Sequence, residues 1–147
     1  MTLPVPPDPR VIIQNSIVTL REVVAPLAED EWARFNASLL IGALEYALGG
    51  LGRDRGAEHR SALAAKVASL QAVVDKRGDK DLLAAFAEKS PFVAASQMLV
   101  WGQNNPGDTA AAIQKTLRAE LYAQLDEEIG AAAPMMGAFV RGMAGEI

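Results

Sequence analysis

The sequence contains no cysteine and only one histidine, His59. Without cysteine the chain can form neither disulfides nor thiolate nucleophiles nor cysteine-ligated zinc sites. A lone histidine cannot build a multi-histidine metal site, and the Glu-x-x-His pairs of a di-iron bundle are missing. The Gly-x-Ser-x-Gly elbow of serine hydrolases is missing as well. We therefore expect no metal and no other cofactor, and we assign no catalytic residue.

Positive charge and long apolar runs are also scarce. Fourteen lysines and arginines stand against 18 aspartates and glutamates, which gives a net charge of -4. This balance leaves no basic field to hold nucleic acid or an anionic membrane surface. The longest uncharged, mostly apolar run, Ala131 to Val140, is far below the roughly 18 to 20 residues that span a bilayer. The N-terminus does not resemble a secretory signal. We therefore expect a cytoplasmic protein that binds neither nucleic acid nor a membrane.

The composition is that of a folded protein, because half of the 147 residues are apolar. A chain of this length can bury roughly two-thirds of its unfolded surface around one core. Prolines 4, 6 and 7 disfavour helix before them, so residues 1–8 should form an extended arm. We expect a single helical domain over residues 9–147.

Apolar residues recur at helical spacing along most of the chain, and no segment alternates as a strand would. Capping residues, prolines and glycines mark the expected helix ends. The sequence predicts an all-α bundle of about five main helices plus short ones, with the second helix central because it is apolar on nearly every side. The expected helices cover residues 9–25, 29–50, 57–76, 79–86, 91–104, 108–129 and a stretch after Pro134.

Several residues are candidates for binding a small molecule. The glycine-rich stretch 49–56 carries two arginines that could hold an anion, and the helix over 91–104 mixes polar and aromatic side chains that could line a cleft. A helix terminator with a flexible loop and ordinary core packing explain the same two segments. For the histidine, a solvated place at a helix start is the alternative to a ligand. The candidate ligand-binding residues are Trp32, Arg53, Arg55, His59 and Trp101.

A flexible apolar stripe near the end of the chain is a candidate docking surface. It consists of Met135, Met136, Phe139, Val140 and Met143, and Arg141 is its only charge. Methionine-rich helical stripes adapt to partner helices. Packing against the protein's own core is the alternative interpretation.

The stretch from Ile17 to Leu48 resembles a group of small uncharacterised bacterial helical proteins. The resemblance lies in Ile-Val-Thr-Leu-Arg-Glu-Val-Val-Ala-Pro, followed by Trp32, Arg34, Phe35 and an apolar helix around Leu44. It covers the first third of the chain. Proteins of that group are encoded beside proteins similar to aminoglycoside phosphotransferases and acyl-CoA dehydrogenases. The resemblance implies an accessory role near acyl-CoA metabolism and assigns no functional residue.

Three hypotheses follow. The first is a non-catalytic interaction or accessory protein, a homo-oligomer or a subunit of a cytosolic enzyme, because apolar helices are present and catalytic signatures are not. The second is a helical bundle that binds an acyl or aromatic acid between helices. The third is an enzyme whose site is assembled only in the fold.

Overall fold

The computed structural model describes residues 7–146. Most of the expected N-terminal arm, residues 1–6, therefore lies outside the described residues. Pro7 and Asp8 are exposed and non-helical, and Asp8 caps the first helix by accepting a hydrogen bond from the Arg10 N–H at 2.9 Å.

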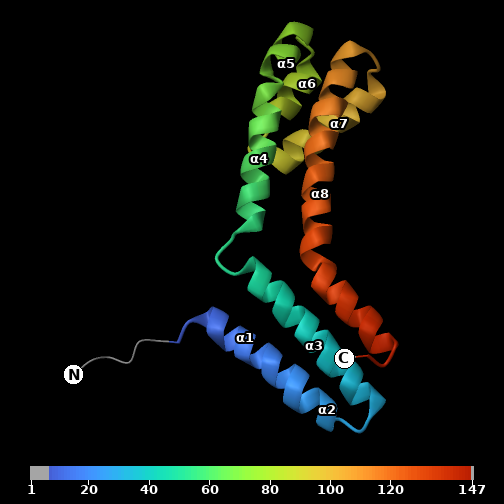
Figure 1. Ribbon diagram of the computed structural model, residues 1–147. Helices are drawn as coiled ribbons and strands as arrows, with labels where there is room; N and C mark the ends of the chain where they lie inside the picture. The colour runs from blue at the N-terminus through green and yellow to red at the C-terminus, as the bar shows by residue number, and fades with distance from the viewer. Residues whose placement is uncertain (1–6, 147) are drawn as a thin grey trace, which may run out of the picture. The chain divides into compact units, whose positions relative to one another are not determined.

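The predicted all-α class is confirmed, since no strand occurs in the described part of the chain (Figure 1). Short loops connect most of the helices. The helical elements are α1 (Pro9–Thr19), the π-helical segment η1 (Leu20–Val24), α2 (Ala25–Leu27), α3 (Glu31–Gly50), α4 (Arg55–Ser69), α5 (Gln71–Arg77), α6 (Lys80–Phe86), α7 (Pro91–Asn104) and α8 (Asp108–Met143).

Aspartates begin several of these helices. Asp30, Asp54 and Asp79 each accept backbone N–H bonds from the first helical turn, of α3, α4 and α6 respectively. Their carboxylates satisfy N–H groups that have no partner within the helix and also suit the positive end of the helix dipole. These three helix starts lie within two residues of their predicted positions.

The sequence predicts that the first helix ends before Pro26, and this prediction is wrong. Pro26 lies inside a helical continuation. A proline ring collides with the carbonyl group four residues before it. Here the turn before Pro26 is widened into η1, in which the Ala25 N–H donates to the Leu20 carbonyl five residues earlier. A π-helical turn is a known way to accommodate such an obstacle, so the helical path reaches Leu27.

The prediction of two helices separated before Pro134 is wrong, because α8 runs unbroken from Asp108 to Met143 with Pro134 inside. The residues before the proline are Ala131, Ala132 and Ala133, and alanine has the highest helix propensity. Pro134 removes one backbone hydrogen bond, which is not enough to end a helix whose flanking turns are supported by packing.

The helix predicted over residues 57–76 is also divided. Leu70 adopts φ -88° and ψ 0°, and it separates α4 from α5. Leu70 and Val74 are both buried, so the change of direction keeps the apolar residues of both helices in one core. Gly78 ends α5 in the left-handed conformation at φ 63°, where glycine has no steric cost.

The residues group into two compact units, which we describe separately. The middle unit comprises residues 54–127, and the terminal unit comprises residues 1–53 and 128–147, of which 7–53 and 128–146 are described. The single domain predicted for residues 9–147 stays a prediction. The middle unit has a well-filled core from α4 to α8, built of Leu63, Val67, Leu70, Val74, Leu82, Ala85, Ala94, Ala95, Met98, Trp101, Ala110, Ile113 and Leu117.

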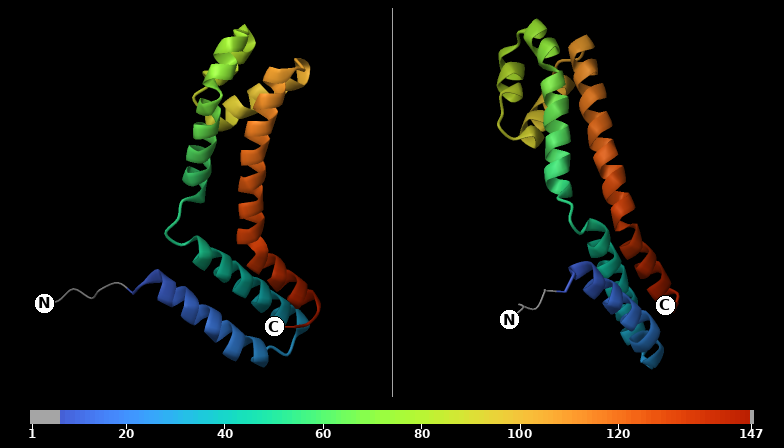
Figure 2. Two further views of the ribbon diagram at one scale, coloured as in Figure 1. Left: turned by 45° about the horizontal axis from the view of Figure 1, so that its top comes forward. Right: turned by 60° about the vertical axis from the view of Figure 1, so that its left-hand side comes forward.

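The terminal unit packs α3 between α1 and the last part of α8 (Figures 1 and 2). Small residues make the contact between α3 and α8: a Cβ atom on Gly42 would collide with the Ala138 Cβ and lie 2.9 Å from the Pro134 carbonyl oxygen. The buried Ser38 hydroxyl donates to the Ala138 carbonyl at 2.8 Å. The predicted central helix is thus the middle helix of this unit.

We expect Gly42→Ala to destabilise the protein by about 1–3 kcal/mol, because the added methyl group must push the α3 and α8 backbones apart. Gly49→Ala is the matched control on the same helix, since nothing lies within 4 Å of its Cβ position. It should stabilise by about 0.5–1 kcal/mol. Urea denaturation followed by circular dichroism measures both changes. Equal stability of Gly42→Ala and the parent chain would contradict the described packing.

Candidate functional site

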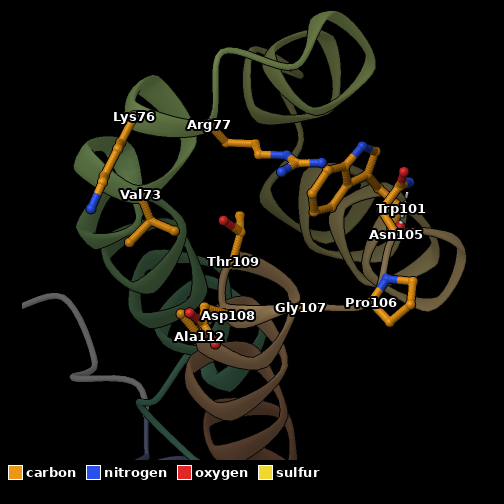
Figure 3. A pocket seen from close by; sticks show the side chains of 10 residues that line it. All are labelled: Val73, Lys76, Arg77, Trp101, Asn105, Pro106, Gly107, Asp108, Thr109 and Ala112. Atoms are coloured by element: carbon orange, nitrogen blue, oxygen red, sulfur yellow. Dashed lines mark hydrogen bonds between the residues drawn. The ribbon is translucent and has the colours of Figure 1, made fainter.

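The largest hollow described in the middle unit has a volume of about 520 Å³. This size lies within the range of small-molecule sites. Its wall combines an indole ring, two cationic side chains and the first turn of α8 (Figure 3). The lining residues are Val73, Lys76, Arg77, Trp101, Asn105, Pro106, Gly107, Asp108, Thr109 and Ala112.

Asp79 fixes the indole of Trp101 beside this hollow. The Trp101 Nε1–H donates to Asp79 Oδ1 at 3.0 Å, and the same oxygen accepts the N–H groups of Asp81 and Leu82, each at 3.0 Å. The bond from the Leu82 N–H, above all, holds the pKa of Asp79 below its usual value. The Trp101 and Asp81 N–H groups and the charge of Arg77 act in the same direction, whereas desolvation opposes them.

Arg77 lies over the Trp101 ring, with its guanidinium carbon 5.8 Å from the ring centroid. This distance is typical of a cation–π contact. Figure 3 shows the Thr109 side chain pointing into the space beside Arg77, whereas the Lys76 ammonium group points away from Trp101. The wall carries two cations against one carboxylate, that of Asp108, so its net charge is positive and suits an anion whose apolar part contacts the indole.

His59 lies elsewhere in the middle unit and does not line this hollow. Its Nε2 atom is 3.2 Å from Glu127 Oε2, and its side chain is 14% exposed. Its carbonyl accepts a hydrogen bond from the nearly buried Gln124 at 3.0 Å. These contacts join the first turns of α4 to α8 and give His59 a structural role in addition to any ligand role.

The remaining candidates from the sequence are dispersed. Arg55 begins α4 of the middle unit, whereas Trp32 and Arg53 belong to the terminal unit. Trp32 is 68% exposed and stacks on Phe35 with a centroid distance of 5.4 Å. Of the five predicted ligand-binding residues, only Trp101 lines the large hollow.

The apolar stripe of the terminal unit remains at the surface. Its side chains are between 42% and 70% exposed: Met135, Met136, Phe139, Val140 and Met143. Phe139 packs edge-on against Phe35, at a centroid distance of 5.9 Å. The closest contacts with α3 are made by Ala138 and by Gly142, where a Cβ would lie 2.7 Å from the Phe35 ring. The small residues of α8 therefore face inward and most of the large ones outward.

Sequence reasoning missed most of the hollow. Asp79 is recognisable as a helix cap, but its bond to Trp101, 22 residues later, depends on how α6 and α7 pack. Lys76 and Arg77 are recognisable as the basic last turn of a helix. No spacing rule connects them to the Asn105–Asp108 turn. Only the tertiary structure shows that these residues line one hollow.

No protein-family model, curated protein or solved structure matches this chain. The resemblance of residues 17–48 to a bacterial group therefore stays a sequence-based expectation. Within residues 7–146, no helix has both the length and the apolar character needed to cross a bilayer. In the same residues, no three histidine, aspartate or glutamate side chains gather closely enough to hold a metal ion.

We expect Asp79→Asn to lower the melting temperature at neutral pH and to flatten its decline in acid. The folded-state pKa of Asp79 lies below the unfolded value of about 3.9, so the carboxylate stabilises the fold above that pH. That contribution is lost as the pH falls through the folded-state pKa. Melting curves between pH 2 and 7 measure the difference. Parallel pH profiles for the variant and the parent chain would contradict the described contact.

Proposed function

We propose that this protein is a non-catalytic cytoplasmic interaction protein that self-associates through the terminal unit. The observation that carries the proposal is the distribution of apolar side chains. Of the 20 large apolar side chains exposed among the described residues, 14 belong to the terminal unit and 6 to the middle unit. The buried apolar residues of the terminal unit number only five: Ile17, Ala25, Ala37, Ile41 and Ala138.

A large apolar surface of this kind marks an interaction site more often than a free surface. The outward side of α8 carries Ile129, Met136, Val140 and Met143, each at least 60% exposed. Ile129, Met136 and Met143 recur every seven residues, which is the spacing at which two helices pack along a common seam. The stripe therefore suits a helix of similar character.

A second copy of the chain is the occupant that fits best. Residues 129–140 contain no charged side chain, so a matching partner surface must be uncharged and helical over three turns. The same stripe on another copy meets this requirement, and two-fold pairing of identical patches is the commonest arrangement of homo-oligomers. A standard interface takes on the order of 800 Å² from each partner, and the exposed apolar side chains of α8 would form its centre.

The accessory role implied by the sequence resemblance agrees with this proposal. A self-associating helical protein suits a subunit that organises an enzyme. The protein self-associates first, and the assembled oligomer is the form that would bind an enzyme.

We expect Val140→Glu to weaken dimerisation roughly a hundredfold or more, because the interface would bury an unpaired carboxylate. Val100→Glu is the matched control: Val100 is a valine on α7 of the middle unit, 51% exposed. Light scattering after size-exclusion chromatography measures the mass. The parent chain and the control should show twice the monomer mass of 15.6 kDa. A monomeric parent chain, or equal dissociation of both variants, would overturn the proposal.

A second candidate function is the binding of an aromatic or acyl acid, which the hollow beside Trp101 favours. An acid in this hollow would lie beside the indole with its carboxylate near Arg77, and the flexible Lys76 side chain would turn inward to meet it. We expect naphthoate to raise the melting temperature of the parent chain and of Lys66→Gln, but to have a smaller effect on Lys76→Gln. Scanning fluorimetry measures these shifts. The same shift in both variants, or none in the parent chain, would contradict this candidate.

A further inference from the structure

Three arginines of the terminal unit gather where η1, α3 and the end of α8 meet. Arg21 and Arg141 line one hollow, of about 350 Å³, together with Ser38, Ile41 and Glu45. Arg21 and Arg34 line a neighbouring hollow, of about 220 Å³. Arg21 belongs to both hollows, so they adjoin at its side chain, with Arg141 at the first hollow and Arg34 at the second.

The charges of this cluster do not balance. Arg21 Nη2 lies 2.8 Å from Glu45 Oε1, and these side chains are 48% and 29% exposed. Within residues 7–146, neither Arg34 nor Arg141 forms an ion pair. Three cations and one carboxylate line the two hollows, in a chain whose net charge is -4. The local excess of about two positive charges favours an anion.

The donors suit an oxyanion with several oxygens. A guanidinium group has five N–H donors in a planar fork, so Arg21 keeps free donors beside its contact with Glu45. The Ser38 hydroxyl already donates to the Ala138 carbonyl, which leaves the arginines as the donors that face the first hollow. Ile41 supplies an apolar wall, which strengthens the electrostatic attraction.

We propose that the Arg21–Arg34–Arg141 cluster binds a phosphoryl group of a small molecule. A phosphate carries about 1.5 to 2 negative charges near neutral pH and accepts paired hydrogen bonds from arginine, so it matches the local excess better than a single carboxylate. The hollow of about 350 Å³ lies at the lower end of ligand-site sizes. Neither hollow is lined by Met136, Val140 or Met143. Arg141 adjoins those side chains, whereas Arg34 lies on α3, so Arg34→Gln tests this inference separately from the proposed self-association.

Isothermal titration of the full chain with pyrophosphate at constant ionic strength tests the proposal. We expect saturable binding of one pyrophosphate per chain, weakened roughly tenfold or more in Arg34→Gln and in Arg141→Gln. Arg118→Gln is the matched control, since it removes the same charge from an exposed position of α8 in the middle unit. It should bind as the parent chain does.

Two further measurements are expected to change the affinity in opposite directions. Glu45→Gln removes the competing carboxylate and should tighten pyrophosphate binding several-fold, an effect that unfolding cannot produce. Malonate, a dicarboxylate, should bind more weakly than pyrophosphate. No binding to the parent chain, equal loss in Arg118→Gln, or weaker binding in Glu45→Gln would overturn the proposal. Equal affinity for malonate would overturn the choice of a phosphoryl group.

Discussion

The close approach of α3 and α8 is the constraint on which the terminal unit depends. Gly42 leaves room only for the Ala138 methyl group, and Gly142 leaves room for the Phe35 ring. Small residues let backbones come close, but they bury little apolar area. The Ser38 hydroxyl therefore matters more here than in a large core, because it joins the two helices by a buried hydrogen bond.

This way of packing determines which residues face outward. A helix that turns its small residues toward its neighbour must present its large residues elsewhere, since successive residues are 100° apart around the axis. On α8 the consequence is the exposed series from Ile129 to Met143. On α1 only Ile17 is buried, whereas Val11, Ile12 and Val18 are about half exposed. The apolar surface of the unit thus follows from its close helix contacts rather than from a shortage of polar residues.

Local signals predicted much of the secondary structure and little of the site. Asp30, Asp54 and Asp79 begin helices because a short carboxylate satisfies nearby N–H groups, an effect that needs no tertiary partner. The predictions that Pro26 ends a helix and that a new helix begins after Pro134 are wrong, because the widened turn of η1 and the support of flanking turns depend on packing. The bond from Trp101 to Asp79 and the grouping of Arg21 with Arg34 and Arg141 join distant segments, which spacing in the sequence cannot reveal.

The stripe of Met135 to Met143 shows where periodicity stops being informative. A 3.6-residue period identifies an apolar face but not what covers that face. Which side of α8 faces α3 depends on Gly42 and Gly142, because only there can the two helices approach closely. Ala138 then faces α3, and Met136 and Val140 face outward. Pairing of two copies through this face would remove these side chains from water, whereas association costs, side-chain ordering and imperfectly paired polar groups offset much of the gain. Pairing through this face is therefore expected to be reversible rather than permanent.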